Sequence, residues 1–342
     1  MSAKNLSFLT FAAIALAVLI AFAFTVGQYS IGLGDAANLL KSAFGGENAD
    51  ANSTRLSEVK IVLEQVRLPR VIAAAVIGAA LSVSGAIFQG MFTNPLVSPG
   101  ILGALNGASF GAALAMLLGL NLFGVQLSAF TFSFSAVLFA LLIAKIYGGG
   151  EKILTLILGG VISSALFGAL VSLVKYLADP YDTLPSIVYW LMGSMSYARI
   201  EHIIFAIPIM AIAILFALSL SKRLDLITLG EDEAIALGAN IGATRLIFVA
   251  IATLLAALSV MICGVVGWVG LVVPHIARFI VGANHIAVIP ASALIGAIFL
   301  LVADTFSRSI FAAEVPLGIL TSIVGIPAFI LALRHAKKAR AC

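Results

Sequence analysis

Long apolar runs, separated by short polar segments, follow one another along most of this chain. A transmembrane helix needs about 20 consecutive apolar residues. By that measure the pattern predicts ten spanning helices, over residues 8–26, 71–92, 102–120, 127–146, 153–177, 203–220, 246–263, 266–279, 287–302 and 316–333. The predicted fold class is therefore an all-α, polytopic integral membrane protein, in which residues 1–342 form a single transmembrane domain.

Several local features refine this pattern. Residues 71–92 are rich in glycine, alanine and serine, which allow close contact between membrane helices. Pro95 and Pro99 then exclude a continuous helix, and non-helical backbone at this depth must be shielded by protein or line a cavity. Residues 27–65 form the longest polar interruption, with a surface helix expected over 36–43. Trp190 is a residue type typical of a membrane interface.

The polar segment 228–245, within the loop 221–245, reads TLGEDEAIALGANIGATR. Three acidic residues follow Gly230, where they suit the positive end of a helix dipole, and Gly238 is a typical stop signal. The segment therefore predicts a helix of about two turns, too short and too polar to span a bilayer. We interpret it as the point where a soluble, energy-supplying partner contacts the membrane protein. The alternative is a solvated loop helix with no partner.

Composition supports a membrane location. The chain is 62% hydrophobic and 10% charged, whereas soluble domains carry roughly a quarter charged residues. Lysine and arginine are scattered between the apolar runs, which favours contact with lipid and argues against a nucleic-acid partner. With both termini inside, eleven basic residues lie on the inner side and eight on the outer side, as the positive-inside rule requires. This orientation makes 27–65 a periplasmic loop and 221–245 a cytoplasmic one.

The sequence offers little chemistry of its own. It contains no Gly-x-x-x-x-Gly-Lys-Ser/Thr motif, so a nucleotide would have to be bound by another subunit. The four histidines show no metal-ligand spacing, and neither a cofactor, a metal site nor a catalytic group is predicted. Asp304 and Arg308 are spaced to pair along one helix face, with Glu314 nearby. Such a pair serves either as a structural anchor or, in an ion-coupled carrier, as a functional group.

Several motifs together resemble those of one family. They are Arg67-Leu-Pro-Arg70, Asn94-Pro-Leu96, Trp190-Leu-Met-Gly193-Ser194, Leu229-Gly230-Glu231, Gly267 to Arg278, Ala303-Asp304, Glu314-Val-Pro316-x-Gly318 and Gly325-x-Pro327. In this order and spacing they are similar to the FecCD-type permeases, the membrane subunits of ABC importers for iron–siderophore chelates, haem and cobalamin. Some relatives move oxyanions such as molybdate. Two departures, Thr93 for a frequent arginine and Asn284-His285-Ile286 for Asp-His-Arg, affect local loop contacts.

The resemblance implies a homodimer in a bacterial or archaeal inner membrane, working with ABC ATPase subunits and a periplasmic or lipid-anchored binding protein. It assigns three sets of residues: ATPase coupling to Gly230, Glu231, Ala234, Leu237 and Gly238; binding-protein docking to Arg67 and Arg308; and an inner gate to Gly150, Glu151 and Thr155. Small Ala234 and Gly238 would let the ATPase approach closely.

The implied function is import of a metal chelate, powered by a separate ATPase, with no enzymatic activity in this chain. A molybdate- or tungstate-type oxyanion importer of the same family is the alternative. Two other classes stay open: an ion-coupled secondary carrier and, more remotely, a polytopic membrane enzyme.

Overall fold

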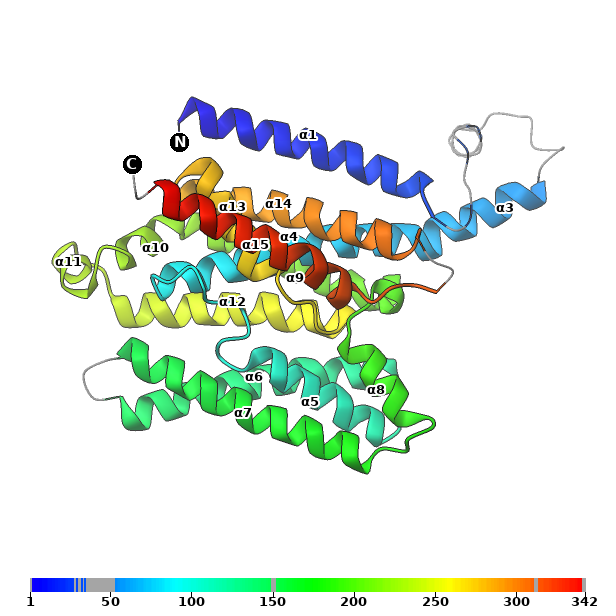
Figure 1. The fold of residues 1–342 in the computed structure, drawn as a ribbon, viewed down its shortest axis with the longest axis horizontal. Helices are drawn as coiled ribbons and strands as arrows, with labels where there is room; N and C mark the ends of the chain where they lie inside the picture. The colour runs from blue at the N-terminus through cyan, green and yellow to red at the C-terminus, as the bar shows by residue number, and fades with distance from the viewer. Residues whose placement is uncertain are drawn as a thin grey trace.

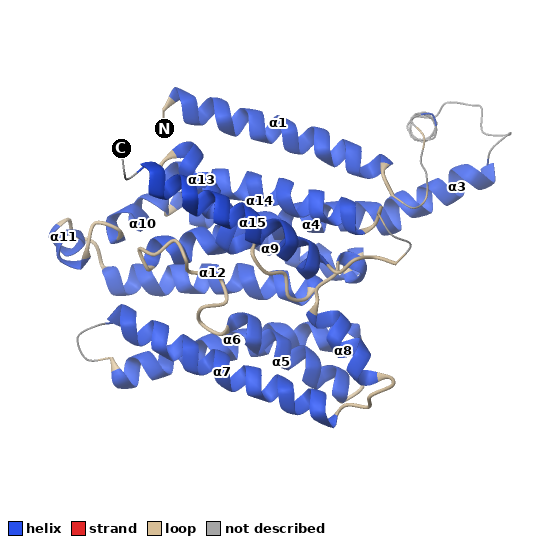
Figure 2. Cartoon of the chain, viewed as in Figure 1, coloured by secondary structure: helices blue, strands red, loops and turns tan. Residues whose placement is uncertain are grey.

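The computed structural model describes residues 2–27, 29, 32, 34, 53–148, 152–310 and 313–339, and this part of the chain consists of helices joined by loops (Figure 2). The expected surface helix at 36–43 lies outside the described residues. The first half contains α1 Ala3–Thr25, α3 Ser53–Ile61, π-helical η1 Val62–Arg67, α4 Leu68–Met91, α5 Ala104–Leu117, α6 Leu122–Tyr147 and α7 Lys152–Leu177. The second half contains α8 Thr183–Leu191, 3-10 helical η2 Met195–Tyr197, α9 Ile200–Ser219, α10 Ser221–Ile227, α11 Glu231–Ala236, α12 Ile241–Cys263, α13 Val269–Val281, α14 His285–Ser307 and α15 Leu317–Ala339.

Each of the ten predicted apolar segments coincides with one of these helices. Among the described residues six helices are long and apolar enough to cross a membrane, and the pair α9 and α10, bent by 56°, makes a seventh. The other three segments are the shorter apolar helices α5, α13 and α15. The all-α, polytopic fold class is confirmed.

The helix α4 is the centre of the molecule and packs against α14, α12, α13 and α9. Its small residues explain how the neighbours come so close. A Cβ atom added to Gly85 would lie 1.7 Å from the carbonyl oxygen of Gly270 in α13, and one added to Gly78 would lie 2.2 Å from that of Gly296 in α14. Backbones in such contact gain dispersion energy that lipid cannot replace, as predicted from the composition of this segment.

The chain folds into two groups of helices. The helices α5, α6 and α7 pack on one another, and α12 joins them to the group around α4 (Figure 1). The beginning of α1, the end of α15 and α11 lie at one end of the molecule, and α3 lies at the other (Figure 1). In the predicted orientation both termini and the loop 221–245 share the inner side, so we call the end that holds α11 the inner end and the end that holds α3 the outer end.

Non-helical backbone occurs where the prolines and glycines predict it. After α4 the chain is irregular until α5, and the side-chain amide of Gln89 donates to the carbonyls of Val97 (3.2 Å) and Leu271 (3.0 Å). At the outer ends of α12 and α15, backbone hydrogen bonds join Ser194 to Cys263 (2.8 Å) and Leu317 to Gly193 (2.8 Å). The backbone polar groups of these irregular segments are thus hydrogen-bonded to other groups of the protein.

Two local predictions were wrong. Polar residues from Ser53 onward were assigned to a loop, but α3, η1 and α4 follow one another as one helical segment, of which the part Ser57–Met91 is long and apolar enough to cross a membrane. Trp190 is not at an interface, because the short helix α8 buries its side chain against Ala108, Val125 and Val260. The indole ring of Trp190 has a large apolar surface, and in this structure that surface packs in the protein interior.

Candidate functional site

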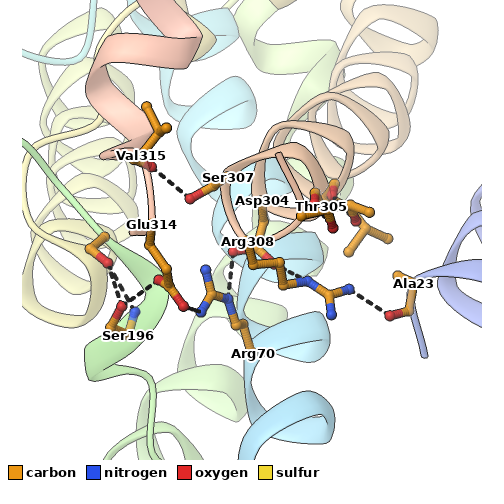
Figure 3. A network of polar contacts seen from close by, with 12 residues as sticks. Ala23, Arg70, Ser196, Asp304, Thr305, Ser307, Arg308, Glu314 and Val315 are labelled. Atoms are coloured by element: carbon orange, nitrogen blue, oxygen red, sulfur yellow. Dashed lines mark hydrogen bonds and ion pairs between the residues drawn. The ribbon is translucent and has the colours of Figure 1, made fainter. Parts of the chain in front are cut away.

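A network of ion pairs closes the outer end of the helix group around α4. Arg70 at the beginning of α4 contacts Asp304 (Nε to Oδ1, 2.7 Å) and Glu314 (Nη1 to Oε1, 2.6 Å), as Figure 3 shows. Asp304 is fully buried and also faces Arg308 one helical turn later (Oδ2 to Nε, 3.5 Å). Two carboxylates therefore neutralise two buried guanidinium groups, and removal of any partner would leave an uncompensated charge.

Glu314 connects this network to η2, the short helix that follows α8. Its Oε2 atom accepts a hydrogen bond from Ser196 Oγ at 2.6 Å, and Ser196 contacts Ser194 (2.8 Å). Burial acts to raise the pKa of Glu314, but the hydrogen bond and charge of Arg70 outweigh it, so the pKa lies below its ordinary value. The carboxylate is therefore ionised at neutral pH and holds the segment before α15 against η2.

Arg67 and Arg308, the predicted docking residues, lie close together and bind the end of α1. Arg308 donates to the carbonyls of Val26 (2.5 Å) and Ala23 (2.5 Å), and Arg67 donates to those of Phe24 and Tyr29. Carbonyls at a helix C-terminus lack intrahelical partners and favour a cation. The two arginines thus cap α1.

Neither guanidinium group is widely exposed. The exposed fractions are only 3% for Arg67 and 7% for Arg308. Both nevertheless line an outward cavity of about 240 Å³, together with Arg70 and Glu314. The predicted role in docking stays a prediction, now for a cavity rather than for two surface side chains.

Sequence reasoning missed Arg70, which is the centre of the network. The residue was visible only as part of the Arg-Leu-Pro-Arg motif, and its partner Asp304 is 234 residues away. A usable signal existed: a charged residue in the first turn of a strongly apolar helix must find a counter-charge inside the protein.

At the inner end, α11 has the boundaries that its glycines predict. Gly230 (φ +121°) precedes the helix, and Gly238 (φ +81°) follows it in the left-handed region. The amide of Gly238 donates to the carbonyl of Ile235 (2.8 Å), and that of Ala239 to the carbonyl of Ala234 (2.9 Å). These two bonds form a Schellman motif, which ends a helix and satisfies its last carbonyls.

Apolar side chains form the exposed part of α11 and of the turn after it. Ala234, which the resemblance assigns to ATPase coupling, is fully buried, and that assignment stays a prediction. The exposed fractions of Ile235 and Leu237 are 60% and 63%, and a Cβ atom on Gly238 would meet nothing within 4 Å. An apolar knob formed by Ile235 and Leu237 therefore projects from the inner end, with Gly238 beside it.

Two polar contacts fix this end to the spanning helices. Glu231 in α11 contacts Arg245 in α12 (Oε1 to Nη2, 2.8 Å). Asp225 in α10 accepts two bonds from His285 at the beginning of α14, from the ring nitrogen Nδ1 (2.6 Å) and from the backbone amide (2.8 Å). These contacts connect α11 to α12 and α10 to α14.

Of the predicted inner gate, Gly150 and Glu151 lie outside the described residues. Thr155 is half-buried in the second turn of α7, and a Cβ atom on Gly148 would lie 3.3 Å from its hydroxyl oxygen. The gate assignment stays a prediction. Among the described residues, no three histidine, cysteine or acidic side chains are placed to hold a metal ion.

Comparisons with known proteins agree with the sequence motifs. The profile of the FecCD transport family matches residues 15–335. The chain is 39% identical over 305 residues to the molybdate import permease MolB of Haemophilus influenzae, covering 89% of this chain and 88% of that protein. It is 36% identical over 284 residues to the hemin transport permease HmuU of Yersinia pestis, covering 80% and 84%.

Solved structures show the same fold. A metal-chelate type ABC transporter in an inward-facing conformation superposes with a TM-score of 0.86 at 36% identity, over 96% of this chain and 99% of that one. PsaBC from Streptococcus pneumoniae superposes with a TM-score of 0.59 at 16% identity, over 82% and 95%. At that identity the second likeness concerns the fold alone.

Proposed function

The chain belongs to the FecCD transport family and is an ABC importer permease of the inner membrane, and on that premise we propose that it imports a metal chelate through a stroke delivered at α11. A separate ATPase subunit seats the apolar knob, Ile235 and Leu237, in a cleft of its own surface. The observation that carries this proposal is a six-residue helix on the inner side, bounded by Gly230 and Gly238. Two large apolar side chains are exposed there, Ile235 within the helix and Leu237 directly after it.

The contacts of α11 support its role as a lever. A helix this short has little stability of its own, so its position depends on what holds it. Buried Ala234 seats α11 on the protein, and the Glu231–Arg245 ion pair ties it to α12. Through α12 a push reaches α4 and α6, which α12 contacts directly.

On the outer side, we propose that a binding protein docks over the cavity lined by Arg67, Arg70 and Arg308. Three guanidinium groups face two carboxylates there, Asp304 and Glu314, so this cavity has one positive charge in excess. Acidic residues on a partner would be attracted to this surface and guided into register. Because Arg67 and Arg308 also cap α1, docking would be sensed at the end of that helix.

A second copy of the chain is the proposed partner for the exposed faces of α7 and α15. In the apolar window of α7 only 28% of the residues are buried, and α15 exposes Ile319, Ile323 and Val324. Lipid can cover such faces, but a transport path needs protein on all sides. Pairing of two copies along these helices would enclose a transport path between them. The predicted inner gate would then lie at the beginning of α7.

A metal chelate is the proposed cargo because the superposed transporter with 36% identity is of metal-chelate type, and a hemin permease is among the relatives. The second candidate is a molybdate-type oxyanion, favoured by the 39% identity to the Haemophilus influenzae permease. An ion-coupled carrier is less well supported, because Asp304 is held by Arg70 and Arg308 instead of lying free within a span.

The test is uptake into proteoliposomes that contain the purified chain with or without its ATPase subunit and binding protein. Radiolabelled ferric chelate and radiolabelled molybdate are offered in separate runs, with ATP inside or absent. We expect uptake of one cargo only with both partners and ATP. Accumulation by the chain alone, or driven by a proton or sodium gradient and abolished in Asp304→Asn, would contradict the proposal.

A further inference from the structure

A cavity at the inner end has a polar lining that the proposed transport mechanism does not use. Its volume is about 480 Å³, and it lies between the end of α4, the second half of α13 and the beginning of α14. The polar side chains that line it are those of Thr93, Thr228, His275, Arg278 and His285. No acidic residue is among the residues that line it.

Arg278 brings an uncompensated charge to this cavity. Its guanidinium group donates to the side-chain oxygen of Gln89 and, at 3.4 Å, to the carbonyl of Ala86. No carboxylate of the described chain lies within ion-pair distance of it, in contrast to Arg70 at the outer end. A half-buried cation at the membrane level is costly unless a counter-charge reaches it. The cavity is the place from which an anion can do so.

Two histidines add independent evidence. His275 and His285 have exposed fractions of 8% and 3%, and the Nε2 atom of each has no hydrogen-bond partner within the described part of the chain. Buried polar atoms are almost always paired, so two orphaned nitrogens beside one cavity indicate a missing partner. Both rings are held in place: His275 packs edge-on against Phe279 (centroids 5.0 Å apart), and His285 is fixed by Asp225.

We propose that this cavity binds a tetrahedral oxyanion of the phosphate type, which enters from the inner side of the membrane. Arg278 supplies the charge and a planar fork of donors, which suits phosphate oxygens. The Nε2–H tautomer of His275 donates a further bond. An anion beside His285 favours its doubly protonated ring, in which Nδ1–H donates to Asp225 and Nε2–H donates to the anion. The ligand is either free phosphate or the phosphate of an anionic lipid headgroup.

The experiment uses the full-length chain in maltoside micelles, which contain no phosphate. The midpoint of thermal unfolding is followed while sodium phosphate replaces sodium chloride at constant ionic strength. A ligand that binds only the folded state raises the midpoint in proportion to the logarithm of its concentration. We expect this rise for the wild type, its loss in Arg278→Gln, and its retention in Arg223→Gln, which removes an exposed arginine of α10.

A second variant guards against misfolding of Arg278→Gln. His275→Phe keeps an aromatic ring against Phe279 but removes Nε2, and we expect a weaker response to phosphate with an unchanged elution profile. A parallel series adds phosphatidylglycerol in place of phosphate. A rise with phosphatidylglycerol that prevents any further response to phosphate identifies the lipid headgroup as the ligand, and a rise with phosphate alone identifies the free anion.

Three outcomes would overturn the proposal. The wild type could respond to neither anion, Arg278→Gln could respond as the wild type does, or Arg223→Gln could lose the response equally, which would indicate a general charge effect. A different result would be a rise of the unfolding midpoint on addition of the ATPase subunit but not of either anion. If Arg278→Gln abolished that rise, an acidic side chain of the ATPase subunit would be the group that fills the cavity.

Discussion

The ion-pair network at the outer end and the cavity around Arg278 at the inner end differ in how their charged groups are paired. At the outer end Arg70, Asp304, Arg308 and Glu314 satisfy one another within the chain, and the spare donors cap α1. At the inner end Arg278 lacks a counter-charge and two apolar side chains of α11 are exposed. The buried charges of the outer network are therefore paired within the chain, whereas Arg278 and the apolar knob at the inner end are left for other molecules to contact.

The largest expected effect is at the outer network. Asp304→Ala leaves Arg308 buried without a counter-charge and Arg70 with Glu314 alone, and breaking a buried charge network in this way costs about 3–5 kcal/mol. We expect a large fall in the midpoint of thermal unfolding in detergent. Asp182→Ala, which removes an exposed aspartate on the same side, serves as the control and should unfold like the wild type. Equal midpoints for Asp304→Ala and the wild type would mean that the network does not stabilise the fold.

A smaller loss is expected where α4 meets α13. In Gly85→Ala the new methyl group would lie 1.7 Å from the carbonyl oxygen of Gly270, so the two helices must separate. Overpacking of this kind costs about 1–3 kcal/mol. Gly267→Ala is the matched control, because a Cβ atom there meets nothing within 4 Å. If both variants unfold at the same temperature, the close approach of α4 and α13 is not essential.

At α11 the expected effect is local. Gly238→Ala places a Cβ atom in the left-handed region (φ +81°), at a cost of about 1–2 kcal/mol. Hydrogen exchange should become faster at the amides of Gly238 and Ala239, with little change elsewhere. Gly242→Ala is the control, since its Cβ atom would meet only Asn240 at 3.8 Å. Unchanged exchange in Gly238→Ala would show that the left-handed cap does not hold the helix end.

The smallest effect concerns the pair between half-exposed Glu231 and buried Arg245. Glu231→Gln should lower stability by at most about 1 kcal/mol, since water screens the exposed carboxylate and the glutamine oxygen still accepts a hydrogen bond from Arg245. We expect it to weaken the attachment of α11 to α12, seen as faster exchange in both segments. Lys60→Gln, which breaks an exposed pair with Glu64 at 4.0 Å, is the control and should have no measurable effect. A larger loss in Lys60→Gln than in Glu231→Gln would reverse the expected ranking.

Much of this architecture could be predicted because the signals are local. Each spanning helix is marked by its own apolar run, and α11 is marked by the glycines on both sides of it. The acidic first turn predicted where α11 begins, and Gly238 predicted where it ends. These features depend on neighbours in the sequence, so no knowledge of the tertiary structure was needed.

The features that were missed depend on residues far apart in the chain. Arg70 is central only because Asp304 and Glu314 come to it from the other half of the sequence. The burial of Ala234 was not foreseen either, because it follows from the packing of α11 on the rest of the protein. In the same way the burial of Arg67 and Arg308 follows from the position of α1, which the motifs do not specify.

The central claim is that a separate ATPase drives transport through α11. The most direct test measures ATP hydrolysis and cargo uptake together in proteoliposomes that contain the double variant Ile235→Glu, Leu237→Glu. Tyr181→Glu, at an exposed residue of the opposite side, is the control. The account predicts that the double variant assembles in the membrane but loses uptake, while the control transports normally. Uptake by the double variant at the wild-type ratio of cargo to ATP would contradict it.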